Sequence, residues 1–121
     1  MTMAREGGLL AWQWRHYAEN HRNRLNLWIH FVAVPTFVGA ALAAAQLLVT
    51  GRYVVAGLAF VVMVGAFALQ ALGHKREAVA PIPFDGVADF AKRVFAEQFI
   101  TFPRFVLSRG FARQSGGHYQ D

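Results

Sequence analysis

The sequence contains no cysteine among its 121 residues. This absence excludes disulfide bonds, thiolate metal sites and a cysteine nucleophile. Acidic residues are also few: seven Asp and Glu stand against twelve Lys and Arg, which gives a net charge of +5. No segment resembles a signal peptide, because charged residues interrupt the chain before position 28. We therefore expect the long hydrophobic runs themselves to direct insertion into a membrane.

The chain is rich in hydrophobic residues, which make up 55% of it, against roughly 45–50% in an ordinary soluble domain. Two uncharged runs cover residues 28–49 and 53–72. Each has about the 20 residues that a helix needs to cross a ~30 Å hydrocarbon core. The connector Thr50-Gly51-Arg52 is too short to recross a bilayer. The sequence thus predicts an all-α membrane protein, one domain over residues 1–121, built on a two-helix transmembrane hairpin.

Amphipathic segments flank the hairpin on both sides. Residues 9–21 carry Trp12 and Trp14, which suit a membrane interface. Prolines at 81 and 83 end the second long helix, and residues 85–102 then follow helical spacing with several aromatics. We predict interfacial helices over both ranges. In a competing interpretation, residues 94–107 dip into the membrane as a short hairpin, which is costly unless Glu97 and Arg104 face the protein interior.

The distribution of Lys and Arg predicts the orientation of the hairpin. Basic residues lie before the first long helix and after the second, whereas the tip has only Arg52. The positive-inside rule places both termini on the cytoplasmic side, and we expect a bacterial inner membrane. The positive charge would anchor the protein to anionic headgroups. Because no basic recognition motif is present, a nucleic-acid partner is not expected.

Three histidines lie at one pair of helix ends and indicate a metal site. A hairpin returns His30, two residues into the first run, and His74, two residues past the second, to one membrane face. His21 is nine residues from His30, which on a straight helix is ~900° and places the two on opposite faces. They can share a metal only if the chain breaks between them, and Asn23 is a good N-cap for a new helix. A lone interfacial histidine, in contrast, is usually just an amphipathic side chain.

Each of these histidines has a polar residue about one helical turn away. Metal-bound imidazoles need such partners to fix the orientation of the ring. The pairs are Tyr17 with His21, Asn26 with His30, and Gln70 and Glu77 with His74. His16 and His118 are weaker candidates, since His16 adjoins Tyr17 near water and His118 lies in a polar tail.

These residues form a pattern: Tyr17-x3-His21-x4-Asn26-x3-His30-x4-Pro35, then Gln70-x2-Gly73-His74-x2-Glu77-x3-Pro81. The pattern resembles the membrane 2-hydroxy fatty acid dioxygenases, whose fungal member acts in α-oxidation during phytosphingosine breakdown. The resemblance spans about residues 17–81, and residues 102–106 look like that family's closing Pro-aromatic segment. Many relatives carry a carboxylate soon after the Pro103 position, where this chain has Ser108-Arg109-Gly110.

The resemblance implies an Fe(II)-dependent oxygenase that uses O2 to cleave a 2-hydroxy fatty acid between C1 and C2. His21, His30 and His74 would be the catalytic metal ligands, and a 2-His-1-carboxylate arrangement would need Glu77 or another acid. A basic side chain could hold the substrate carboxylate; the candidates are Arg22, Arg24, Lys75 and Arg76.

Two other classes of protein stay open. Two transmembrane helices that each offer a histidine also suit a bis-histidine haem protein. The third reading is a non-catalytic membrane scaffold, whose histidines would tolerate replacement without loss of a metal. A homo-oligomer is a further open alternative for any of the three.

Overall fold

The computed structural model describes residues 5–108, which are helical apart from short connections and contain no strand. The prediction of an all-helical chain is confirmed over this range. The elements in chain order are α1 (Gly8–Tyr17), η1 (Ala18–Asn20), α2 (Arg24–Val49), α3 (Tyr53–His74), α4 (Val87–Ala96), η2 (Glu97–Thr101) and α5 (Phe102–Leu107).

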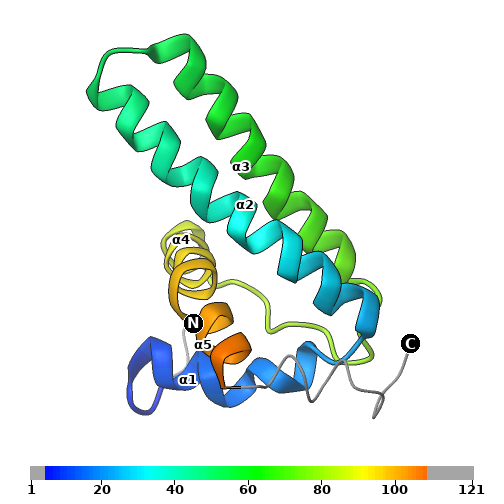
Figure 1. The fold of residues 1–121 in the computed structure, drawn as a ribbon. Helices are drawn as coiled ribbons and strands as arrows, with labels where there is room; N and C mark the ends of the chain where they lie inside the picture. Colours follow the sequence, from blue (N-terminus) through cyan, green and yellow to red (C-terminus); the bar gives the residue numbers. More distant parts are fainter. Residues whose placement is uncertain (1–4, 109–121) are drawn as a thin grey trace.

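Helices α2 and α3 run antiparallel, side by side, and project from the rest of the molecule (Figure 1). They are longer than predicted, because α2 begins at Arg24 instead of 28 and α3 ends at His74 instead of 72. At the tip, Gly51 has a φ of 77°, a left-handed conformation that favours glycine. Helix α2 continues through Pro35 without interruption.

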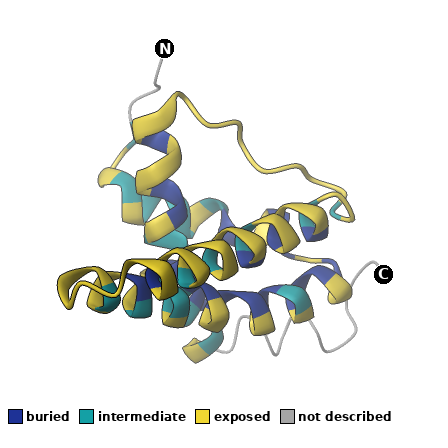
Figure 2. Ribbon diagram, turned by 90° about the horizontal axis from the view of Figure 1, so that it is seen from above, coloured by how far each residue is buried: buried dark blue, intermediate teal, exposed yellow. Residues whose placement is uncertain are grey.

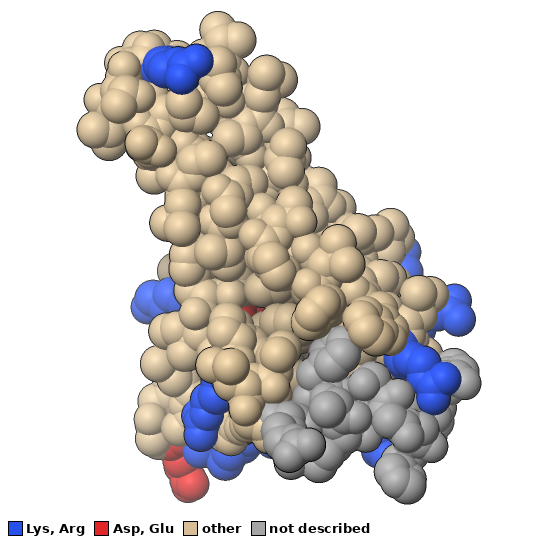
Figure 3. Space-filling model, in the orientation of Figure 1, with Lys and Arg blue, Asp and Glu red and all other residues tan. Residues whose placement is uncertain are grey.

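Both long helices are apolar and mostly exposed. In the most hydrophobic 18-residue stretch of each helix, 22% of the residues are buried in α2 and 17% in α3. Core helices of a soluble domain are buried to a larger extent. Figure 2 shows exposed residues along the outer sides of the hairpin and buried ones where helices meet. Both helices are long and apolar enough to cross a membrane. In Figure 3, Lys and Arg lie at the base and at the tip of the hairpin, with an uncharged stretch between.

The remaining helices pack around the base of the hairpin. The predicted helix over 9–21 ends earlier, because α1 stops at Tyr17 and one turn of η1 follows. The predicted helix over 85–102 is instead a continuous helical run from 87 to 107 that includes the π-helical η2. This run has no turn within residues 94–107, so the alternative of a short hairpin there is wrong.

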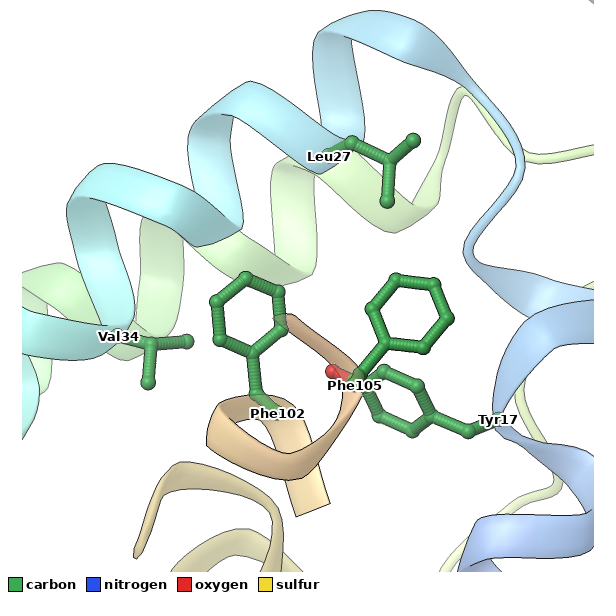
Figure 4. Packing of buried hydrophobic residues seen from close by; sticks show 5 residues of the cluster. All are labelled: Tyr17, Leu27, Val34, Phe102 and Phe105. Carbon is green, nitrogen blue, oxygen red and sulfur yellow. The ribbon is translucent and has the colours of Figure 1, made fainter. Parts of the chain in front are cut away.

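Two small hydrophobic clusters hold these helices against the hairpin. In the first, aromatic rings from α1 and α5 lie under α2 (Figure 4); its buried members are Tyr17, Leu27, Val34, Phe102 and Phe105. In the second, α4 packs on both long helices; its buried members are Ala33, Phe37, Ala66 and Val94. The two clusters therefore attach α1, α4 and α5 to the long helices α2 and α3.

A carboxylate ties the start of α2 to the end of α3. Glu77 accepts hydrogen bonds from the backbone nitrogens of Arg22 and Asn23, at 2.8 and 3.0 Å, and from Asn26 Nδ2 at 2.6 Å. Asn26 also packs directly on Gly73, where a Cβ would collide with its side chain. This close approach sets the position of the α2 start against α3.

We expect the substitution Gly73→Ala to destabilise the protein by about 1–3 kcal/mol, the usual cost of overpacking a filled site. The added methyl group would displace Asn26 and weaken its bond to Glu77. The matched control is Gly65→Ala, which places its methyl group in open space. Unfolding in detergent, followed by circular dichroism, measures the difference. Equal stability of the two variants would contradict the close contact.

Candidate metal centre

Four side chains from four separate segments meet at the base of the hairpin. They are His21, His30, His74 and Glu97, and one potential ligand atom from each lies within 4.8 Å of the others. We call them the four-residue cluster. The structure thus brings together the three histidines that the sequence singled out, with ring centroids 4.7–4.9 Å apart. It adds a carboxylate from a fourth segment.

The predicted break between His21 and His30 is present. Asn23 has an extended backbone, with φ −73° and ψ 129°, and its side chain accepts a hydrogen bond from the backbone nitrogen of Asn26 at 3.1 Å. It therefore caps α2, as the sequence predicted. The break turns His21 back toward His30, which a straight helix would place on the opposite side.

Backbone carbonyls orient two of the imidazoles. His21 Nδ1 donates to the Tyr17 carbonyl at 2.7 Å, and His30 Nδ1 donates to the Asn26 carbonyl at 3.0 Å. Because a carbonyl only accepts, Nδ1 carries the proton of each neutral ring and Nε2 keeps its lone pair. These Nε2 atoms lie 3.2 and 3.5 Å from Glu97 Oε2. Lone pairs of nitrogen and oxygen thus point into one small space.

The facing nitrogen atoms lack ordinary partners. His21 Nε2, His30 Nε2 and His74 Nδ1 are buried and have no hydrogen-bond partner among the described residues. Unpartnered buried polar atoms are costly, typically 1–3 kcal/mol each. A metal cation at the centre would satisfy all three nitrogens and the carboxylate at once. The donor set therefore fits a metal ion.

The ionisation states of the cluster also favour a cation. Burial lowers the pKa of His21 below its usual value, so the ring is neutral and can ligate. Burial acts to raise the pKa of Glu97, whereas hydrogen bonds and positive charge from the imidazoles of His21 and His30 hold it well below its usual range, so positive charge within the cluster keeps Glu97 ionised. The carboxylate is therefore an anion at neutral pH.

Glu97 is the member of the cluster that the sequence did not predict as a ligand. It begins the π-helical turn η2, an irregularity that often marks functional sites. Its Oε2 accepts a hydrogen bond from the Tyr17 hydroxyl at 2.8 Å, and the Tyr17 ring stacks on His21 with centroids 3.7 Å apart. Its position in an aromatic-rich amphipathic segment was the available signal, because an acid there needs an interior partner.

Glu77, in contrast, is not in the cluster. Its oxygens are taken up by the backbone and side chain at the start of α2, as described above. Gln70 pairs with Gln98 through two amide hydrogen bonds of 2.8 Å each, and not with His74. The predicted partners Tyr17 and Asn26 do contact the histidines, through the carbonyls that orient them.

A cavity of about 200 Å³ opens beside the cluster, and its wall includes His21, His74 and Glu97. The predicted carboxylate-binding residues do not line this cavity; all are exposed, and Arg24 and Arg76 line a separate pocket. The cation in its wall is Arg93. His16 also lines the cavity, pairs with Glu19 at 3.1 Å and is not in the cluster. His118, Arg109 and Gly110 lie outside the described residues.

Comparison with protein families identifies a family for this chain. The family model described as "Mpo1-like: 2-hydroxy-palmitic acid dioxygenase Mpo1-like" matches residues 9–101, most of the chain. The chain belongs to the Mpo1-like family. This match confirms the resemblance seen in the sequence, and the matched range includes all four residues of the cluster. No curated protein and no solved structure is significantly similar to the chain.

We expect Glu97→Gln to remove bound metal while leaving the fold intact. The amide keeps the size of the carboxylate and can still accept the Tyr17 hydrogen bond, but it loses the negative charge that faces the imidazoles. Elemental analysis of the purified protein measures the metal content.

Glu77→Gln is the matched control for this substitution. It should lower thermal stability, because Glu77 holds the start of α2, and it should retain the metal. Full metal content in the Glu97 variant would show that Glu97 is not a ligand. Loss of metal only in the Glu77 variant would assign Glu77 as the carboxylate ligand.

Proposed function

We propose that this protein is an Fe(II)-dependent dioxygenase that cleaves 2-hydroxy fatty acids between C1 and C2 at a membrane surface. The observation that carries the proposal is the group of buried, unpartnered imidazole nitrogens facing the Glu97 carboxylate. The family description, which names a 2-hydroxy-palmitic acid dioxygenase, supports the reaction class.

The donor set suits non-haem iron. His21, His30, His74 and Glu97 would hold the metal, and nitrogen–carboxylate sites with open positions are typical of Fe(II) oxygenases. When bound, Fe(II) would supply the O2 chemistry that amino-acid side chains lack. The cavity on the side of His21 and His74 would admit the carboxyl and 2-hydroxyl groups of the substrate.

The residues of the chain hold this site in one geometry. The carbonyls of Tyr17 and Asn26 keep the proton of each ring on Nδ1, so that Nε2 stays available as a ligand. The Tyr17 hydroxyl, whose pKa burial raises well above its usual value, stays protonated and donates to Glu97. The bond from Tyr17 limits the rotation of the carboxylate. Phe102 and Phe105 pack nearby and exclude water.

The reaction balances without a further reductant. A 2-hydroxy acid and one O2 give the acid one carbon shorter, CO2 and water. C2 is oxidised from an alcohol to a carboxylic acid and C1 from a carboxylic acid to CO2, which together release four electrons. One O2 accepts four electrons, so no second co-substrate is needed.

The position of the cluster along the two long helices supports a site at the membrane surface. Helices α2 and α3 would cross the bilayer, with α1 and α4 at its cytoplasmic interface. His30 lies near the start of α2 and His74 is the last residue of α3, so the cluster would lie near headgroup depth. A long-chain acid places its carboxyl and 2-hydroxyl groups at the same depth.

Two alternatives would give different results in the same experiments. A bis-histidine haem protein would show a Soret band, although it uses two axial ligands where four side chains converge here. A scaffold would contain no stoichiometric metal. Metal analysis with an absorption spectrum therefore separates the three functions.

We expect the iron-loaded protein in detergent to convert a long-chain 2-hydroxy fatty acid to the acid one carbon shorter. The plain fatty acid should remain unchanged, because it lacks the hydroxyl that the site would bind. Product analysis by mass spectrometry and O2 uptake measure the reaction. His74→Ala serves as the metal-free control. Turnover at the same rate without O2 would exclude the oxygenase.

We also expect the hairpin tip to face away from the cytoplasm. Because the native chain has no cysteine, Gly51→Cys introduces a single thiol at the tip. A membrane-impermeant thiol reagent should label it from outside the cell. Labelling from the cytoplasmic side alone would contradict the predicted orientation of the hairpin.

A further inference from the structure

Part of the cavity wall beside the cluster is formed by α3, which contributes apolar residues as well as Gln70 and His74. His74, Ala71 and Phe67 all line the cavity. They share one face of α3 at spacings of three and four residues. Phe67 lies seven residues before His74, ~10 Å away along the helix axis in the direction of the hairpin tip. The cavity wall therefore leads from the metal ligands toward the part of α3 that is proposed to lie in the bilayer.

Another part of the cavity wall is the segment between α3 and α4. Residues 81, 82 and 84 line the cavity. Arg93 holds this segment, because its guanidinium donates to the carbonyls of Ile82 and Pro83 at 2.6 and 2.9 Å and lies over the Phe84 ring at 4.4 Å. It also contacts Asp89 at 3.4 Å. Arg93 thus holds this part of the wall.

Phe67 and Phe84 line the cavity, and Phe90 lies outside its lining. Phe90 contacts Phe67 and Phe84, with ring centroids 5.3 and 4.9 Å apart. Phe84 is 44% exposed and Phe90 is 38% exposed. The cavity wall at Phe84 therefore reaches the outer surface of the protein beside α3. Aromatic rings at this place suit contact with alkyl chains.

We infer that the alkyl chain of the substrate runs along the Ala71–Phe67 face of α3 and leaves the protein past Phe84 and Phe90 into the bilayer. The inference rests on the proposed function, because it places the carboxyl and hydroxyl groups at the four-residue cluster. The cavity supports this route because it adjoins the cluster and because Phe67, Ala71 and Phe84 are among its lining residues. The substrate enters sideways from the membrane.

The size of the cavity predicts how turnover depends on the length of the substrate chain. Its volume of about 200 Å³ is below the roughly 300–1000 Å³ of sites that bury a drug-sized ligand. The protein can enclose the head of the substrate and its first few carbons, whereas the rest of the chain stays in the lipid. Turnover should therefore depend weakly on chain length among long-chain acids.

A substitution that narrows the cavity at one position tests the proposed route of the alkyl chain. Ala68 and Ala71 are both exposed residues of α3, but only Ala71 lines the cavity, so Ala71→Phe places an aromatic ring in the cavity wall and Ala68→Phe does not. We expect Ala71→Phe to lower kcat/KM for a long-chain 2-hydroxy acid about tenfold or more, the usual scale of a steric misfit. The loss should be smaller for a short-chain 2-hydroxy acid, because less of its chain passes the lining of the cavity. The Ala68 variant should match the wild type for both substrates.

A second readout does not depend on turnover. A 2-hydroxy fatty acid with a diazirine close to its carboxyl end is bound without O2 and photolysed, and the labelled peptides are mapped by mass spectrometry. Labels should fall on the peptides that contain Phe67, Ala71 and Ile82, and Ala71→Phe should reduce them. Iron content and thermal unfolding of both variants control for damage to the site.

The outcomes separate the inference from the proposed function. A wild-type protein without turnover of any 2-hydroxy acid would contradict the proposed function, and the photolabelling would still report the binding route. An active wild type with equal activity in the Ala71 and Ala68 variants, or labels confined to other helices, would overturn the route alone.

Discussion

The structure depends on one electrostatic constraint: imidazole nitrogens and a carboxylate oxygen face each other in a buried space. Nε2 of His21 and His30 lies 3.2 and 3.5 Å from Glu97 Oε2, and these nitrogens have no hydrogen-bond donor near them in the described part of the chain. Such an arrangement is unfavourable without a cation or protons between the groups. The fold must therefore hold the cluster together against its own repulsion.

Polar contacts between helices provide this restraint. Glu77 ties the start of α2 to the end of α3. The Gln70–Gln98 amide pair links α3 to η2, and Thr101 donates to Gln13 of α1. All of these lie at the base of the hairpin, where buried apolar area is small because much of α2 and α3 is exposed. Removing one partner would leave the other buried and unpaired, which costs more than the bond itself contributes.

The same arrangement separates two environments around the site. The cluster and its hydrogen bonds form a polar centre, and the cavity leads from it along α3 to aromatic rings at the surface. Arg93 supports this boundary by binding the carbonyls of the 81–84 segment and stacking on Phe84. An amphiphilic acid matches both environments at once, with its polar groups at the cluster and its chain toward the lipid.

Local sequence determined the helices, the break at Asn23 and the convergence of His21, His30 and His74, because run length, capping and hairpin geometry depend on neighbouring residues. The residue pattern also identified the family. Only the tertiary structure decided between Glu77 and Glu97 as the carboxylate, since Glu97 reaches the histidines through the packing of η2 against α1 and α2. Helical periodicity defines which face a side chain occupies, but the partner of that face depends on contacts between distant segments, such as Tyr17 and Glu97, which are 80 residues apart.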